Sequence, residues 1–187
     1  CRQRQMCIRD SGYTTLESLP YSQRASLSDA TQDTLNPDGT TQRLVNDKVG
    51  YIRNSVKATV DAYDGTVDLY EFDKNDPVLK AWEGVFPDVV KPEAEISDEL
   101  REHFRYPEDM FKVQRDLLAR YHVDDPNVFF NNDAFWSVPN DPTAEESRQL
   151  NQPPYYVMAA DPETGKPTFQ LTTSYPVSYT HLTLPTT

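Results

Sequence analysis

Long apolar runs, glycine and positive charge are scarce in this 187-residue sequence. No stretch approaches the roughly 20 apolar residues that a membrane-spanning helix requires, and none has the pattern of a secretory signal. The sequence has 18 Lys and Arg residues against 30 Asp and Glu residues, so its formal net charge is −12 and we expect no nucleic-acid partner. The six glycines form no Gly-rich loop of the kind that binds phosphate.

The frames of familiar catalytic and metal sites are missing too. The sequence has no G-x-S-x-G motif, and its three histidines stand in neither an H-x3-H nor an H-E-x-x-H frame. We therefore predict no catalytic, cofactor-binding or metal-ligating residue. What is present suits packing, because 37% of the residues are hydrophobic and 11% are aromatic. This composition predicts one ordinary globular core.

Both ends of the sequence resemble translated sequencing adapter rather than protein. Residues 5–10 and residues 177–182 match translations of one transposase mosaic-end sequence, read from opposite strands. We therefore predict that residues 1–11 and 177–187 are not native and that residues 12–176 are a fragment of one domain. Both cysteines, Cys1 and Cys7, lie in the first of these ends, so their spacing indicates neither a disulfide nor a metal pair.

The clearest local pattern is a β-hairpin. Residues 56–62 alternate apolar and polar side chains, residues 64–65 are Asp-Gly, and residues 66–72 suit a second strand. A two-residue turn would place Ala62 opposite Val67 on one buried apolar face.

Three short helices and a second hairpin complete the expected fold. Apolar residues recur at helical spacing, and caps and prolines bound the segments, as Asp76 and Pro77 do at the start of the first helix. In the third helix we expect Lys112, Arg115, Asp116 and Arg120 to face solvent. Residues 12–49 read as mostly irregular surface. The sum is an α+β fold in which β-hairpins flank a small helical middle, with much irregular surface; the expected helices are 77–86, 97–104 and 110–121, and the second hairpin joins 155–159 to 168–172.

A pair of carboxylates is the first chemistry to consider. The expected register places Asp61 directly opposite Asp68 on the polar face of the hairpin. Such a pair could bind a divalent cation or share a proton as a general acid and base. Alternatively, the face is solvated or the register differs, and the two acids do nothing together.

Histidines, acidic loops and aromatics are the other candidates. His103 is far in sequence from His122, which we place at the end of the third helix, where an imidazolium suits the helix dipole. The loops 73–76 and 161–165 resemble calcium loops in composition but lack the ligand spacing. A group of aromatic side chains is either core or a surface that stacks on a sugar or a partner; its members are Phe129, Phe130, Phe135, Trp136, Tyr155 and Tyr156.

Several ordered blocks of the sequence resemble uncharacterised protein family 0182, a family of large bacterial membrane proteins. The resemblance covers nearly all of residues 12–176 and is carried by GYTT (12–15), PYSQ (20–23), YIRNSVKATVDAYDGTV (51–67), DPVLKAW (76–82), RYPEDMFKVQRDLLARYHV (105–123) and NQPPYYV (151–157). It implies a parent chain several times longer, with a bundle of membrane helices and an extracytoplasmic region from which this segment comes. It implies no reaction, cofactor or site residue. Asp68 stands where an uncharged residue is expected, which weakens a cation site as a property of the family.

These observations lead to three hypotheses of function. The first is a structural or interaction role at the cell envelope, in which the segment contacts the rest of its parent chain, including its transmembrane helices, or envelope components. The second is an envelope glycan-acting hydrolase that uses paired carboxylates. The third is a calcium-dependent binding module built on the acidic loops.

Overall fold

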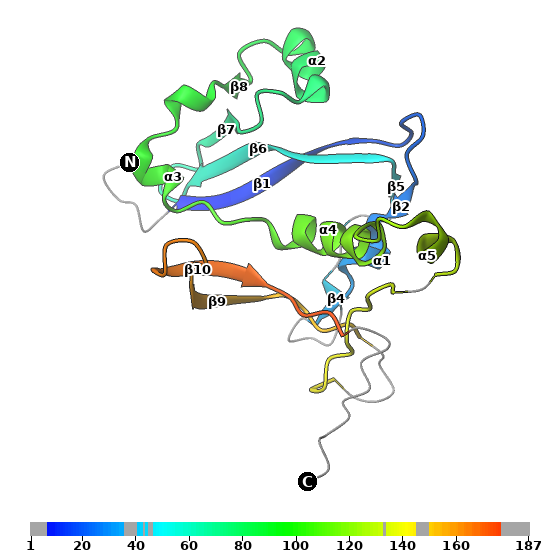
Figure 1. Cartoon of the computed structure of the whole chain (residues 1–187). Coiled ribbons are helices and arrows are strands. Elements are labelled where there is room, and N and C mark those ends of the chain that lie inside the picture. The colour runs from blue at the N-terminus through cyan, green and yellow to red at the C-terminus, as the bar shows by residue number, and fades with distance from the viewer. Residues whose placement is uncertain are drawn as a thin grey trace. The chain divides into compact units, whose positions relative to one another are not determined.

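The computed structural model describes residues 7–35, 41–42, 44, 47–132, 134–144 and 150–176. The chain forms two compact units, each built from two separate stretches of sequence (Figure 1). Unit 1 comprises residues 1–26 and 47–110, and unit 2 comprises residues 27–46 and 111–187. The predicted α+β class is confirmed, because both units combine strands with short helices. The predictions that 12–176 belong to one domain and that both ends are adapter stay predictions.

Unit 1 is built on a four-stranded sheet in the order β1-β6-β7-β8. The strand β6 (Tyr51–Asp61) lies between β1 (Cys7–Leu16) and β7 (Val67–Glu71) and is antiparallel to both. The short strand β8 (Val90–Lys91) is parallel to β7. The remaining elements are the strand pair β2 (Ala25–Ser26) and β5 (Lys48–Val49), helix α2 (Pro77–Val85), the 3₁₀ turn η2 (Glu93–Glu95) and helix α3 (Asp98–Arg101).

Unit 2 is built around most of helix α4. This helix spans Glu108–Tyr121, and the division between the units falls after Met110. A two-stranded antiparallel sheet pairs β9 (Tyr155–Ala160) with β10 (Pro167–Thr172), as the sequence predicted. The other elements of the unit are α1 (Leu27–Thr31), β3 (Thr34–Leu35), β4 (Thr41–Gln42) and α5 (Pro126–Phe130). No helix within the described ranges combines the length and the apolar character needed to cross a bilayer.

The expected register of the β6–β7 hairpin is wrong by two residues. Val67 lies opposite Val60, not Ala62, because residues 62–65 form a four-residue loop. Asp61 closes this loop, since its Oδ1 accepts a hydrogen bond of 2.8 Å from the Tyr63 amide. Its own amide donates to the Thr66 carbonyl at 2.9 Å, and Gly65 adopts a positive φ of 76°. The sequence Asp-Gly favoured a tighter turn, but an aspartate at the loop entrance stabilises the wider one.

The expected buried face of β6 is also wrong. The deeply buried side chains are the polar ones, Ser55, Lys57 and Thr59, whereas the apolar residues between them are half-buried. Strand alternation is preserved, but partners within unit 1 make the polar face the inner one. The Lys57 ammonium lies 5.0 Å from the centroid of the Phe72 ring and 5.8 Å from that of Phe104. Such cation–π contacts allow an amine to be buried.

The helices form where the sequence predicts them, with two differences. Helix α3 is shorter than the expected 97–104, and α4 begins at Glu108, two residues early. Two side chains of α4 expected in solvent, Lys112 and Arg115, are instead buried, at 2% exposure each. Their burial has a partner in Asp33, described below.

Contrary to the expectation from the sequence, the stretch 12–49 is not mostly irregular. It supplies half of β1 and all of α1. The strand β1 was missed because its pairing with β6 joins residues that are 35 to 54 positions apart, and no local pattern signals it. Helix α5 was missed in the aromatic segment after His122.

Two glycines make a matched test of this backbone. We expect Gly65→Ala to lower the free energy of unfolding by about 1–2 kcal/mol, because a side chain disfavours its positive φ. Gly84→Ala in α2 should leave stability unchanged or raise it by up to about 1 kcal/mol, because alanine favours helix. An added Cβ meets no atom within 4 Å at either site, so urea unfolding reports the backbone effect alone. Equal effects of the two substitutions would contradict the loop described here.

Candidate functional site

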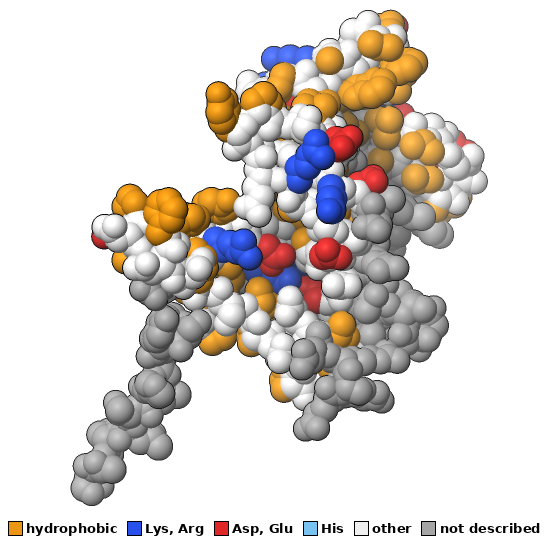
Figure 2. Space-filling model, turned by 90° about the vertical axis from the view of Figure 1, so that its right-hand side faces the viewer, with side chains coloured by type: hydrophobic (Ala, Val, Ile, Leu, Met, Phe, Trp, Pro, Cys, Tyr) orange, Lys and Arg blue, Asp and Glu red, His pale blue; other side chains and the backbone are white. Residues whose placement is uncertain are grey.

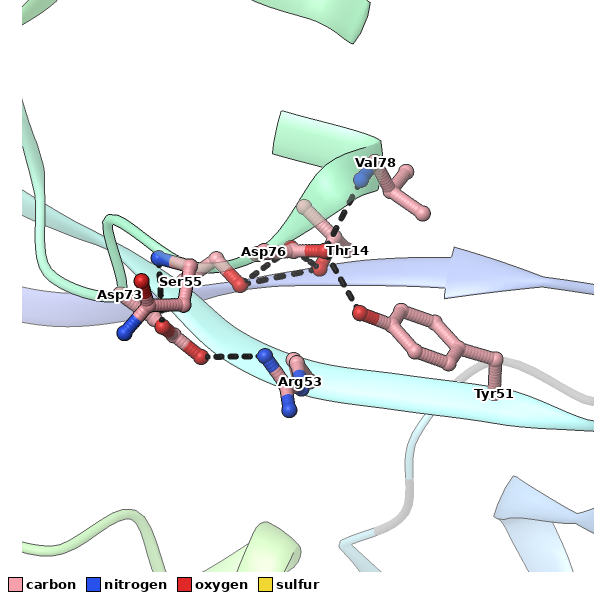
Figure 3. Close-up of polar contacts among 8 residues, drawn as sticks. Thr14, Tyr51, Arg53, Ser55, Asp73, Asp76 and Val78 are labelled. Carbon is pink, nitrogen blue, oxygen red and sulfur yellow. Dashed lines mark hydrogen bonds and ion pairs between the residues drawn. The ribbon is translucent and has the colours of Figure 1, made fainter. Parts of the chain in front are cut away.

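A buried aspartate joins three elements of unit 1. Asp76 precedes α2, is fully buried, and faces Thr14 of β1 and two residues of β6, Tyr51 and Ser55 (Figure 3). Three of the blocks that carry the family resemblance supply these residues: 12–15, 51–67 and 76–82. The sequence predicted Asp76 only as the cap of a helix. Its strand partners were missed, because a lone Thr, Ser or Tyr in a strand carries no local signal.

Asp76 accepts hydrogen bonds from four donors. Its Oδ1 accepts from the Tyr51 hydroxyl at 2.6 Å and from the Val78 amide at 2.9 Å. Its Oδ2 accepts from the Ser55 hydroxyl at 2.5 Å and from the Thr14 hydroxyl. The bond from Val78 is the N-cap of α2, and the other three tie the start of that helix to the sheet.

This arrangement holds the carboxylate in its charged form. Burial alone would raise the pKa of Asp76, but the hydrogen bonds from Ser55, Thr14, Tyr51 and the Val78 amide outweigh it and lower that pKa to about 2. Burial and the bond to Asp76 raise the pKa of Tyr51 to about 12. A carboxylate offers about four acceptor positions, and all are used here. Asp76 therefore acts as an anchor and has no lone pair left for a substrate proton.

The loop that leads into α2 is held by a second acidic residue. Asp73 Oδ2 lies 3.0 Å from a guanidinium nitrogen of Arg53, and its Oδ1 accepts from the Asn75 amide at 3.0 Å. The amide of Phe72 donates to the Ser55 carbonyl at 2.8 Å. The acidic loop 73–76 is thus a connection between β7 and α2 whose carboxylates already have protein donors.

Unit 2 contains a buried group with two positive charges and one negative charge. Asp33 Oδ1 lies 2.7 Å from the Lys112 ammonium, and its Oδ2 lies 3.0 Å from a guanidinium nitrogen of Arg115. All three side chains are 3% exposed or less. Arg115 also donates to the Gln152 carbonyl at 3.0 Å, and its backbone carbonyl accepts from the Tyr175 hydroxyl at 2.9 Å. Arg115 thereby connects α4 to the turn that follows α1 and to the segment that follows β10.

The proposed carboxylate pair does not form. Thr59, not Asp61, lies opposite Asp68, because the register differs by two residues. Asp68 Oδ1 lies 2.7 Å from the Lys91 ammonium, and Asp61 caps the hairpin loop. The two acids therefore have separate structural partners, and the premise of a general acid and base at this position is wrong.

The two histidines lie in different units. His103 is exposed and lies in the turn that follows α3. His122 follows α4, as expected, and its ring nitrogens contact the carbonyl oxygens of Leu118 at 2.8 Å and Ala134 at 3.1 Å. Its ring stacks on Trp136 at 3.6 Å between centroids. These contacts fasten the chain after α4.

Of the remaining candidate residues, some pack within the structure and others are exposed to solvent. Asp161 closes the β9–β10 loop by accepting from the Glu163 and Thr164 amides at 3.0 and 2.8 Å. Within the described ranges, no three His, Cys, Asp or Glu side chains gather as a metal ion would require. Phe129, Phe135 and Trp136 are half-buried and make ring contacts, whereas Phe130 is 84% exposed. Tyr155 and Tyr156 are 47% and 38% exposed on β9.

Comparisons with known proteins place the chain among uncharacterised proteins. The sequence model of uncharacterised protein family UPF0182 matches residues 2–182. A UPF0182 protein of Corynebacterium glutamicum strain R is 74% identical over 165 residues, which are 88% of this chain and 17% of that protein. UPF0182 proteins of Corynebacterium diphtheriae and Rhodococcus jostii are 69% and 65% identical, over 88% and 87% of this chain and 17% and 16% of their own lengths. No solved structure matches the chain.

The Asp76 anchor can be tested through its charge. We expect Asp76→Asn to lower the free energy of unfolding by about 2–4 kcal/mol, because an amide cannot accept all four bonds. Asp98→Asn, an exposed acid in the first turn of α3, is the control and should cost less than about 0.5 kcal/mol. Urea unfolding at pH 7 measures both.

The pH dependence of stability gives an independent check. Because the pKa of Asp76 is lower in the folded state than in the unfolded state, its contribution is complete above about pH 4 and is lost as the pH falls toward 2. Asp76→Asn should therefore lose less stability than the unmodified chain between pH 4 and 2. Parallel pH profiles would contradict a charged Asp76 in the folded state.

Substitutions within the buried charged group of unit 2 should have unequal effects on stability. Asp33→Asn removes the carboxylate that pairs with both buried cations and should cost about 3–5 kcal/mol. Lys112→Met retains the one-to-one pair of Asp33 and Arg115, fills a similar volume, and should cost less than about 2 kcal/mol. The comparison is made by urea unfolding, and a larger loss for Lys112→Met than for Asp33→Asn would contradict this account.

Proposed function

The chain belongs to uncharacterised protein family UPF0182, and we propose that it is a structural and interaction segment of a longer protein at the cell envelope. It spans about 17% of the length of the curated relatives that it matches. In this proposal the segment lies outside the membrane and packs against the remainder of its own parent chain. Envelope components are further candidate partners.

The observation that carries the proposal is an apolar surface around α2. Trp82, Val85, Phe86 and Val89 are each more than half exposed, at 56%, 63%, 54% and 53%. We call these four residues the α2 patch. Hydrophobic side chains gather near the top of the view in Figure 2, where α2 is drawn. Scattered exposed apolar residues are ordinary, but a contiguous group marks a surface that another structure covers.

The α2 patch has the composition of a binding anchor. The rings of Trp82 and Phe86 stack with centroids 5.8 Å apart and an angle of 12° between their planes. Large aromatic side chains dominate the energy of protein interfaces because they bury much area at little cost in conformational entropy. Because Trp82 and Phe86 are each more than half exposed, much of that burial energy is not gained within this segment.

The Asp76 anchor explains how the patch is presented. Helix α2 has only nine residues and buries Leu79 as its inner side chain, which is little packing for an independent helix. Three of the four bonds to Asp76 fix its first turn to β1 and β6 instead. The buried polar cluster thus holds a short helix in place while its apolar face stays uncovered. Such pre-organisation lowers the entropic cost of docking.

The location rests on the family resemblance and on charge. The resemblance implies membrane helices in the parent chain and an extracytoplasmic origin for this segment. The net charge of −12 is unfavourable for a nucleic-acid partner. The hydrolase and calcium-binding alternatives gain no support from the described residues, since their acids already pair with protein groups.

Docking of the α2 patch can be measured on the intact parent protein by hydroxyl-radical footprinting. If the remainder of the chain covers the patch, Trp82 and Phe86 should react about tenfold or more slowly in the folded protein than in urea, because a docked aromatic is shielded from water. An uncovered patch would show about a twofold difference, given that both rings are slightly over half exposed. That outcome would overturn the proposal.

A variant pair supports the same measurement. Phe86→Gln should lower the melting temperature of the intact protein by several degrees, because it removes buried apolar area at the docked surface. Phe130→Gln replaces another exposed aromatic, outside the α2 patch, and should change the melting temperature little. Equal effects would count against a special role for the patch.

A further inference from the structure

The β9–β10 hairpin is a two-stranded sheet with little burial. Among the described residues, neither strand pairs with any strand but the other. Met158 of β9 is 65% exposed, and its cross-strand partner Phe169 is 48% exposed. A two-stranded hairpin is marginally stable by itself in water, and an exposed apolar face needs cover from another element.

Hydrogen-bond alternation shows which backbone groups of β9 point outward. The Asp161 amide donates to the Lys166 carbonyl at 2.8 Å, so these two residues form a hydrogen-bonded pair at the end of the ladder. Bonded and non-bonded pairs alternate along antiparallel strands. Ala159 and Val157 therefore bond to β10, whereas the amides and carbonyls of Ala160 and Met158 point to the outer edge.

The two edges of the hairpin are not equivalent. On β10 the outward-pointing position next to the loop is Pro167, which has no amide hydrogen to donate. Proline on an edge strand is a common device against strand addition. The six residues of β9 contain no proline, no glycine and no charge. Strand addition is thus disfavoured on the β10 side and unopposed on the β9 side.

We propose that a β-strand from the part of the parent chain outside residues 12–176 adds to the outer edge of β9. The inference rests on the proposed function, since it names a second surface by which the segment joins the remainder of its chain. The relatives are about six times longer than the matched segment, so the parent supplies ample chain for such a strand. A strand in the same molecule also pairs at a high effective concentration, unlike a strand from another molecule.

Amide hydrogen exchange on the intact parent protein tests the edge with an internal control. If a strand is added, Met158 and Ala160 should exchange about as slowly as their neighbours Val157 and Ala159. If the edge is free, exchange should alternate, with Met158 and Ala160 about tenfold or more faster than the two residues bonded to β10. Such alternation would overturn the proposal.

Cross-linking identifies the occupant. Photo-methionine at Met158 should link to a peptide of the same molecule outside 12–176, and mixing unlabelled with isotope-labelled copies separates links within a molecule from links between molecules. A link to a second copy or to another protein would overturn the proposal. Failure here would leave the footprint of the α2 patch unchanged, so the proposed function and this inference can fail separately.

A substitution supplies the functional check. Met158→Pro removes an outward amide and should raise exchange at Ala160 about tenfold, because the added strand loses a bond and is displaced. Met158→Lys keeps the amide and serves as the control for the side chain. The hairpin itself is monitored through slow exchange at Val157, which both variants should retain. Unchanged exchange at Ala160 in Met158→Pro would contradict strand addition.

Discussion

Unit 1 depends on the charge of one buried carboxylate. Asp76 is fully buried yet ionised, because Thr14, Tyr51, Ser55 and the amide of Val78 satisfy it completely. Those donors come from two strands and from the first turn of α2, so one group fixes the helix to the sheet. The same requirement explains why Ser55 faces inward on β6, where apolar alternation predicted the opposite face. A buried charge tolerates no missing partner, and it therefore decides the orientation of the strand around it.

Unit 2 also contains a buried carboxylate, which is paired with two cations instead of neutral donors. Asp33 pairs with Lys112 and Arg115, so these two polar side chains of α4 lie inside together with Val113 and Ala119. Other apolar side chains of α4 are left partly exposed, Leu117 and Tyr121 among them. In both units a polar cluster is buried beside a few apolar side chains, while several other large apolar side chains stay at the surface. Large exposed apolar side chains are unfavourable in an isolated domain, and they suit a segment whose apolar surfaces are covered by more protein.

Local chemistry made much of the fold predictable. Asp76 and Pro77 marked the start of α2, and Asp-Pro-Glu-Thr-Gly marked the loop between β9 and β10, since caps and turns act through neighbours in sequence. The register of β6 and β7 was predictable only in outline. Asp61 binds the Tyr63 amide and widens the loop by two residues, which separates Asp61 from Asp68 and removes the carboxylate pair. The hydrogen bond from the Tyr63 amide to Asp61 thus excludes the paired-carboxylate chemistry that the sequence suggested.

The sequence by itself determined the family, the α+β class and the positions of the main helices and hairpins, because these depend on ordered blocks, periodicity and short-range caps. Only the tertiary structure decided which side chains are buried. Thr14, Ser55 and Asp76 are up to 62 positions apart, and Asp33 lies 82 positions from Arg115. Hydrogen bonds and ion pairs over such distances leave no trace in local spacing, yet the cost of an unsatisfied buried charge makes them decisive.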